Sequence, residues 1–300
     1  MTVHAAAPSP GALYDEGVTP TAQSPSSRPG RGAAQMTEHL ERGLMLLPAS
    51  ANVVMQLSRR AVGRGVAESK VSNGSLMRHP VKRLRTTLAY IWMALYGSED
   101  ERHAMRRSVD AQHRHVRSRP DDEVTYDAYD ADLQLWVAAC MFVGSLQGYE
   151  TLYGRADERT TNQLLARCGR FATTLQVPLS RWPRDRAAFA DYWSSATRQV
   201  EIDEVTGAYL RDFAALAYLP RPLAWTLGPV NRLLTRGYLA PVFREALGWS
   251  WSSRDQRRFE RFCRLARWVN HVLPAPLARF PWNLVRYDTR RRMARHRPLT

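Results

Sequence analysis

The sequence has few cysteines, and they do not form a metal-binding or redox motif. Cys140, Cys168 and Cys263 are the only three, and no two of them form a Cys-x-x-Cys pair. Their spacing argues against a zinc knuckle or a redox dithiol, and the lack of Cys-x-x-Cys-His excludes the usual covalent attachment of haem. An odd number of scattered cysteines favours a reducing compartment.

Lysine is almost absent, so the positive charge of the chain comes from arginine. There are 43 lysines and arginines against 28 aspartates and glutamates, a net charge of +15, and the only lysines are Lys70 and Lys82. A GC-rich genome can produce this bias without any selection for guanidinium chemistry. The charge permits binding to nucleic acid, to an anionic membrane or to acidic ligands, and it specifies none of them.

Long apolar runs are also missing. No stretch reaches the length of about 18 apolar residues that a membrane-spanning helix needs. The first ten residues, "MTVHAAAPSP", lack the basic start and apolar core of a signal peptide. The sequence therefore predicts a soluble, cytoplasmic protein, and peripheral contact with an anionic membrane stays open as an alternative.

Strand signals are nearly absent, whereas helix signals recur along the chain. Residues 1–35 are rich in Pro, Ser, Ala and Gly without hydrophobic periodicity, so we expect a disordered tail there. From Met36 onward we expect one all-α domain over residues 36–300, with a basic C-terminal end at 273–300. A hydrophobic content of 44% is enough for a core of useful size.

Capping signals delimit two successive helices in the first half of this domain. Pro80 suits the first turn of a helix that Gly97 ends. The Ser-x-x-Glu sequence at 98–101 is a capping box, which predicts that the next helix starts there. That second helix is expected to carry both His113 and His115.

A central helix is predicted between Asp130, which suits an N-cap, and Gly154. Its sequence is apolar nearly all round, which is typical of a helix buried on every side. The apolar stretch 218–251 is interrupted by four prolines, and we expect it to pack as short helices, with a substrate channel or a membrane contact as alternatives. Further helices are expected over 157–175, 184–199, 203–217 and 254–272.

The two neighbouring histidines differ in their expected orientation. On a helix, Met105, Val109 and Val116 form one apolar stripe; His113 lies about 60° from its centre and His115 about 100° away on the other side. Residues two apart do not face each other, so the pair cannot share a metal ion. His113 is the better candidate for an inward-facing group. Spacing alone favours a half-buried histidine bonded to a backbone carbonyl.

The helix expected over 80–97 has an apolar stripe and a second row beside it. The apolar stripe consists of Val81, Leu84, Leu88, Ile91, Trp92 and Leu95. The second row consists of Arg83, Thr87, Tyr90 and Ala94. Because buried polar groups need partners, this row is expected to face either solvent or a ligand with a polar end.

Three segments in succession resemble the motifs of the MpaB / latex-clearing-protein (rubber oxygenase) superfamily. They are "HPVKRLRTTLAYIWMALYG", "VDAQHRHVRS" and "YDAYDADLQLWVAACMFVGSLQGYE". They carry Arg-x-x-x-Thr on one helix, His-x-x-Val on the next, and Tyr-x-Ala-x-Asp-x-x-Leu-x-x-Trp-Val at the entry to a central helix. Upstream, "ANVVMQLSRRAVGRGVAES" resembles the first core segment of the family. The similarity is good over residues 45–155 and loose beyond them.

This resemblance implies an all-α protein that binds a non-covalent haem b and uses it for dioxygen chemistry on isoprenoid chains. His113 matches the proximal ligand of the haem iron, and Arg83 and Thr87 match polar residues that line the haem pocket. His115 would then face outward. Glu68, in "GVAESK", is a candidate distal acid or base. The function expected is a haem-dependent oxygenase that takes dioxygen and a hydrophobic, isoprenoid or lipid-like, substrate.

Two positions depart from the family pattern. In rubber oxygenases a lysine just before the conserved threonine can occupy the other face of the iron, and this chain has Thr86 at that cofactor-binding position. The change implies a sixth coordination site that is open or filled by water, and it argues against rubber as the substrate. Many relatives have a histidine after the Trp-Val pair, where this chain has Ala138. That change removes one polar contact and leaves the haem assignment standing.

Two further interpretations compete with the oxygenase. The first is a non-catalytic helical protein that binds haem or lipid, because a resemblance indicates a site more readily than an activity. The second is a nucleic-acid binder, since 13 arginines and only 3 acids follow position 253. A basic end of this kind is typical of a solvated or loosely ordered terminus. No recognition helix is evident, so nucleic acid is the disfavoured partner.

Other chemistries have less support. Glu101, His103, His113 and His115 would be spread around their helix and do not form a non-haem metal site, and no His-Glu-x-x-His motif occurs. The Gly-x-Ser-x-Gly signature of serine hydrolases is missing too. The surroundings of Cys140 and Cys168 are apolar, so we expect both in the core rather than as nucleophiles.

Overall fold

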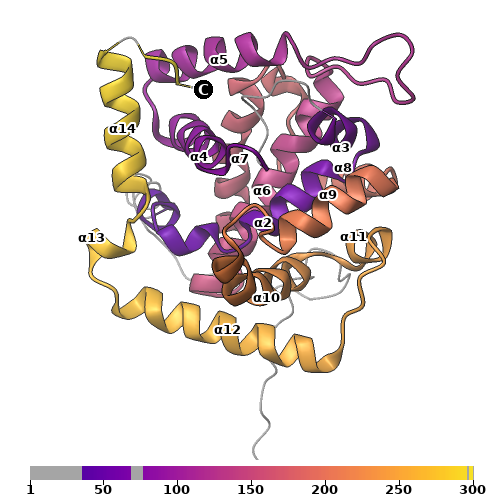
Figure 1. Cartoon of the computed structure of the whole chain (residues 1–300). Coiled ribbons are helices and arrows are strands. Elements are labelled where there is room, and N and C mark those ends of the chain that lie inside the picture. Colours follow the sequence, from indigo (N-terminus) through magenta and orange to yellow (C-terminus); the bar gives the residue numbers. More distant parts are fainter. Residues whose placement is uncertain (1–35, 69–76, 296, 300) are drawn as a thin grey trace, which may run out of the picture.

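The structure is a computed structural model that describes residues 36–68, 77–295 and 297–299 (Figure 1). The disordered tail predicted for residues 1–35 lies outside these ranges. Within them the chain is helical, and its only β pairing is an isolated antiparallel bridge between Arg117 and Asp127. The predicted all-α class is confirmed. None of the helices in the described ranges combines the length and the apolar character that a membrane crossing requires.

The helices begin and end close to the positions that the sequence predicted. The helices predicted over 157–175 and 254–272 are found as α7 and α12, and those over 184–199 and 203–217 as the slightly shorter α8 and α9. From the N-terminus the described elements are η2 (Gly43–Leu46), α2 (Ala49–Leu57), α3 (Arg60–Ala67), α4 (Pro80–Tyr96), α5 (Glu99–His113), α6 (Ala131–Tyr153), α7 (Glu158–Thr174), η4 (Leu179–Arg181), α8 (Arg186–Thr197), α9 (Glu204–Ala214), α10 (Arg221–Tyr238), α11 (Pro241–Ala246), α12 (Ser253–Val272), α13 (Ala275–Ala278) and α14 (Trp282–Ala294).

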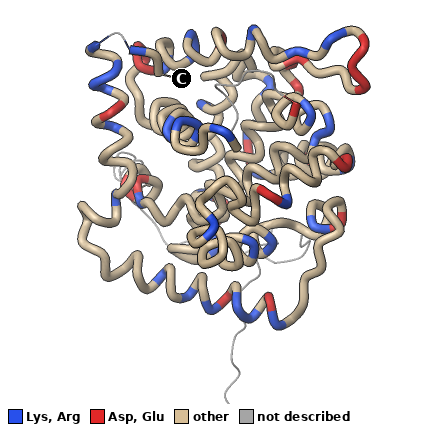
Figure 2. Tube along the Cα trace, in the orientation of Figure 1, with Lys and Arg blue, Asp and Glu red and all other residues tan. Residues whose placement is uncertain are grey.

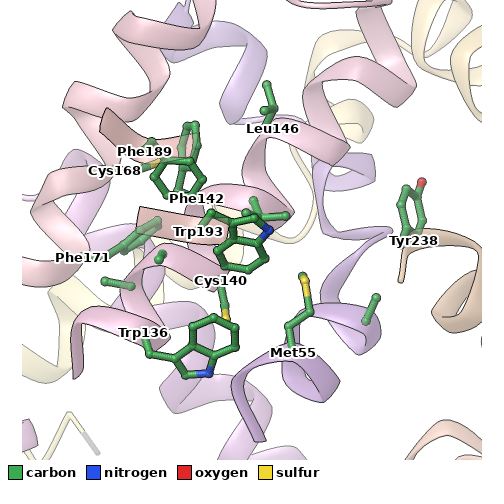
Figure 3. Close-up of a cluster of buried hydrophobic side chains, with 14 of the residues drawn as sticks. Met55, Trp136, Cys140, Phe142, Leu146, Cys168, Phe171, Phe189, Trp193 and Tyr238 are labelled. Atoms are coloured by element: carbon green, nitrogen blue, oxygen red, sulfur yellow. The ribbon is translucent and has the colours of Figure 1, made fainter. Parts of the chain in front are cut away.

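Helix α6 is the buried centre of the fold, as predicted. The Asp130 carboxylate caps it by accepting hydrogen bonds from the first backbone amides, and Gly154 ends it with a φ of +94°, a value that favours glycine. Helices α2, α7 and α12 and the turn η2 pack around it. Its Trp136 stacks on Trp193 of α8 with ring centroids 5.1 Å apart, within the aromatic cluster shown in Figure 3.

The α4–α5 pair begins and ends where the sequence predicted. Pro80 is at the first position of α4, and Ser98 and Glu101 form the reciprocal capping box of α5. The apolar stripe expected on α4 is only partly buried, however, because Val81 and Leu84 are exposed. The apolar core that α4 shares with α5 and α14 begins at Leu88, and Arg85 before it forms an ion pair with Asp288 of α14 at 3.7 Å.

Helix α5 ends at His113. The angles predicted for His115 and Val116 assumed that the helix continued to Val116, about one turn farther. His115 lies in the turn that follows, where the backbone amide of Val116 donates to the carbonyl of His113. The helical angles predicted for His115 and Val116 are therefore wrong. The outward position of His115 is confirmed, since its side chain is exposed.

The proline-rich stretch 218–251 does not fold into short helices only. It forms the 18-residue helix α10, which contains Pro229, and the short helix α11. A proline inside a helix leaves the carbonyl four residues earlier without its donor, here that of Trp225. Both residues are exposed, so water can replace the missing donor and the helix continues.

The basic end at 273–300 is not a loose terminus over its described residues. It forms α13 and α14, and α14 packs along α4. Trp282 is buried, and its indole nitrogen donates to the carbonyl of Arg42. Arg290 forms an ion pair with Glu101 of α5 at 3.3 Å. Enough apolar surface on one side of this basic helix therefore anchors it to the body.

The contrast between buried and exposed leucines gives a direct stability test. Leu164 of α7 is fully buried, whereas Leu265 of α12 is 56% exposed. Leu164→Ala should lower the free energy of unfolding by about 2–5 kcal/mol, because it removes buried methyl groups and leaves a cavity. Leu265→Ala should change it by less than about 0.5 kcal/mol. Urea unfolding followed by circular dichroism measures both, and equal losses would contradict the described core.

Candidate functional site

His113 continues the buried row of α5. Met105 and Val109 are buried in the core that α5 shares with α4, and His113 follows at the same four-residue spacing, which places successive side chains on one face. The ring of Tyr129 meets the imidazole edge-on, with centroids 6.4 Å apart. The Tyr129 hydroxyl donates to the carbonyl of Asp110 at 2.9 Å and so braces the segment that follows α5.

The imidazole of His113 is held neutral and one of its nitrogens has no partner. Among the described residues, Nδ1 is buried without a hydrogen bond, so the backbone-carbonyl bond that spacing alone favoured is missing at this atom. Burial, and then the positive charge of Arg83, lower the pKa of His113, while Asp110 and Asp127 partly oppose this. At neutral pH the ring is therefore uncharged, which is the form that binds metals.

Arg83 lies in the first turn of α4. The residue is exposed, and desolvation lowers the pKa of its guanidinium. Because Arg83 also acts on the pKa of His113, the structure brings these two predicted site residues together across the α4–α5 interface.

The other residues of the row that contains Arg83 on α4 differ in whether a ligand can reach them. Thr87 is exposed, one turn beyond Arg83 on the same face. Tyr90 and Ala94 are not available to a ligand, because the Tyr90 hydroxyl donates to the carbonyl of Phe171 at 2.6 Å and Ala94 is fully buried. Thr86 donates its hydroxyl to the carbonyl of Arg83 at 3.0 Å, so that donor is used within α4.

Tyr209 of α9 is a site residue that the sequence did not reveal. Its phenol lies close enough to Arg83 for each group to shift the pKa of the other, and Tyr218 lies near Tyr209 in the same way. Burial raises the pKa of Tyr209, so the hydroxyl keeps its proton and can donate. More than 100 residues separate Tyr209 from Arg83 in the chain, and no local pattern marked it.

Glu68 lies at the C-terminal end of α3 in an ionic cluster. Its carboxylate pairs with Arg64, and Arg64 also binds Asp203 at 2.5 Å and Glu123 at 3.2 Å. This cluster ties α3 to the start of α9 and to the loop before α6. The described contacts of Glu68 do not include His113 or Arg83, and its catalytic role stays a prediction.

The available donor set suits a cofactor that needs one protein ligand. Within the described part of the chain, no three His, Cys, Asp or Glu side chains lie close enough together to hold a metal ion. Haem iron needs only one imidazole from the protein, and His113 offers one beside an arginine. Burial raises the pKa of Cys168 to about 12 and also raises that of Cys140, so both thiols stay protonated in the core, as predicted.

Comparison with known proteins shows the family of the chain. Residues 36–268 match the family described as ER-bound oxygenase mpaB/B'/rubber oxygenase, catalytic domain. The uncharacterized proteins Mb2261 of Mycobacterium bovis and Rv2237 of Mycobacterium tuberculosis are each 43% identical over 252 residues, which cover 84% of this chain and 98% of theirs. No solved structure matches the chain. The family match contains α4, α5 and α6 and ends before α13.

The lowered pKa of His113 predicts a dependence of stability on pH. The unfolded chain holds the ordinary imidazole pKa of 6.5, so below that pH it binds a proton that the folded chain resists. The free energy of unfolding should fall as the pH drops through this value toward the folded pKa. The fall between about pH 8 and about pH 5 should be smaller in His113→Gln than in the wild type.

His115→Gln is the matched control for this measurement, because His115 is exposed two residues away. Its unfolding free energy should follow the wild-type dependence on pH. An unchanged pH dependence in His113→Gln, measured by chemical unfolding at each pH, would show that His113 is not desolvated.

Proposed function

This chain belongs to the family of ER-bound oxygenase mpaB/B' and rubber oxygenase catalytic domains, and from that premise we propose that it is an oxygenase with a non-covalent haem b. Its substrate in this proposal is a hydrophobic, isoprenoid or lipid-like, small molecule that reacts with dioxygen. The family itself indicates an oxygenase. The observation that supports the finer proposal is the buried, unpartnered Nδ1 of His113 beside the desolvated guanidinium of Arg83.

The residues present fit a haem group. Neutral imidazole is a good ligand for iron, and His113 is kept neutral by burial and by Arg83. The forked guanidinium of Arg83 suits a carboxylate, and haem carries two propionate carboxylates that would offset the cost of burying its charge. When bound, haem supplies the centre at which dioxygen is bound and activated.

Other groups near Arg83 would shape what else binds there. Thr87 supplies an exposed hydroxyl one turn after Arg83, and Tyr209 supplies a protonated phenol near Arg83. Leu84 is exposed on α4 and lies three residues before Thr87, so the two side chains are neighbours on one face of the helix. An apolar group beside a few polar groups favours a hydrophobic substrate with little polar functionality.

Haem binding through His113 has a spectroscopic signature. Protein purified after expression with ample haem supply should show a Soret band, with about one haem per chain by the pyridine haemochrome assay. His113→Ala should lose or shift this band, because it removes the imidazole that would hold the iron. His115→Ala should keep the wild-type spectrum, since His115 faces outward.

Circular dichroism separates the failure of this proposal from misfolding. Wild-type protein with normal helical content and no haem would overturn it, and so would equal losses of the Soret band in both histidine variants. A Soret band that disappears only in His113→Ala would identify the iron ligand.

Turnover distinguishes an oxygenase from a non-catalytic helical protein that binds haem or lipid. Haem-loaded wild-type protein supplied with a reductant and a panel of terpenoids and unsaturated lipids should consume dioxygen and yield oxygenated products. His113→Ala should reduce the rate at least about tenfold because it removes the iron ligand. Haem binding without oxygen uptake or product for any member of the panel would favour the non-catalytic alternative.

A further inference from the structure

Helices α12, α13 and α14 meet at an exposed apolar corner of the molecule. Figure 1 shows α12 along one edge and α14 along the adjoining edge, with α13 between them where they converge. At this corner Trp268 is 62% exposed and Leu277 is 63% exposed, and Val272, Phe280 and Leu284 are also exposed. We call these five residues the C-terminal corner. A cluster of large apolar side chains in water usually marks an interaction surface.

The outward face of α12 changes character along its length. Its buried residues, Phe259, Ala266 and Asn270, face the body of the protein. The advance of about 100° per residue places Trp268 on the opposite side of the helix. From the N-terminal end, this outward face carries Arg257, Arg261, Arg264, Leu265, Trp268 and Val272, all exposed. It is therefore basic far from α13 and apolar next to it.

The outward face of α14 also changes from apolar to basic, but here the apolar residues come first in the chain. Its buried residues are Trp282 and Thr289, so the opposite side of the helix faces away from the body. That side carries Leu284, Tyr287, Arg291 and Arg295 in order, all exposed. Both helices thus have their apolar outward residues beside α13 and their arginines farther away.

The arginines on these two faces are free to bind an outside partner. Arg257, Arg261 and Arg264 form no ion pair with any residue that the structure describes. At the far end of α14, four arginines and Asp288 line a recess of about 110 Å³, and Asp288 itself is paired with Arg292. In Figure 2 blue segments recur along α12 and α14, whereas α13 is mostly tan.

We propose that the C-terminal corner docks on an anionic lipid surface. The apolar side chains around α13 enter the boundary between headgroups and acyl chains, where tryptophan is favoured, and the arginines of α12 and α14 bind lipid phosphates on either side. A second copy of this chain fits less well, because pairing two such corners would bring arginines against arginines. The family match ends at residue 268, so it includes most of α12, whereas α13 and α14 lie beyond it.

This proposal does not rest on the proposed haem chemistry. A lipid surface would also hold a hydrophobic substrate near the protein, but docking is measurable without haem and without turnover. The membrane contact considered for the stretch 218–251 is a separate surface, and its exposed Trp225 provides a control. Trp225 of α10 is 75% exposed and does not belong to the C-terminal corner.

Flotation with lipid vesicles tests the proposal on the full-length protein. We expect the wild type to float with vesicles of phosphatidylcholine and phosphatidylglycerol, and to bind pure phosphatidylcholine and high-salt samples much less. Leu265→Ser with Trp268→Ser should weaken binding at least about tenfold, because both side chains lose their apolar burial. Arg261→Gln with Arg264→Gln should weaken it by roughly tenfold or more.

Matched controls make either result decisive. Trp225→Ser removes a tryptophan that is more exposed than Trp268, and Arg107→Gln with Arg114→Gln removes two exposed charges on and just after α5, so both should bind like the wild type. Circular dichroism verifies folding of every variant. Absent binding by the folded wild type, or equal losses in controls and corner variants, would overturn the proposal. So would dimerisation of the wild type, seen by sedimentation velocity, that Trp268→Ser abolishes.

Discussion

The burial of α6 on all sides is the constraint on which the rest of the structure depends. A helix that is apolar all round is stable only when other helices cover every face, and α2, α7 and α12 do so here together with η2. Helix α7 in turn packs against α4, where the Tyr90 hydroxyl donates a hydrogen bond to the carbonyl of Phe171, and α4 contains Arg83. The candidate site is thus positioned by a chain of packing contacts that begins at α6.

The candidate site departs from the rule that buried polar groups find partners. The Nδ1 atom of His113 has none in the described chain, and desolvation lowers the pKa of the nearby guanidinium of Arg83, an exposed residue. A buried polar group without a hydrogen-bond partner lowers the free energy of unfolding by about 1–3 kcal/mol. A stable core can offset this loss, but the unpartnered group itself does not stabilise the fold. Such a cost is typical of a site that binds a ligand, and the α4–α5 core around Trp92 and Met105 holds both groups in place.

The proposed haem site and the proposed lipid-docking corner differ in how their polar and apolar groups are arranged. Around Arg83, the polar groups of His113 and Tyr209 lie close together, whereas at the C-terminal corner apolar groups project outward between arginines. An oxygenase for hydrophobic molecules must take its substrate from somewhere other than water, because such substrates partition into lipid. A lipid-docking corner on α12–α14 would bring the protein to that source, although each proposal stands on its own observations.

The sequence by itself determined the helical class, the capped starts of α5 and α6, the buried character of α6 and the preference for His113 over His115. These follow from short-range rules: a capping box, an N-cap aspartate and a four-residue periodicity each depend on neighbours within one or two turns. Only the tertiary structure decided that Val81 and Leu84 are exposed, that α10 continues through Pro229, and that Tyr209 lies near Arg83. It also decided that the basic end docks on α4 and that Trp268 of α12 is exposed. Each of these depends on which distant helix covers a given face. The periodicity of a single sequence shows that a helix has an apolar face, but it does not show which other helix packs against that face.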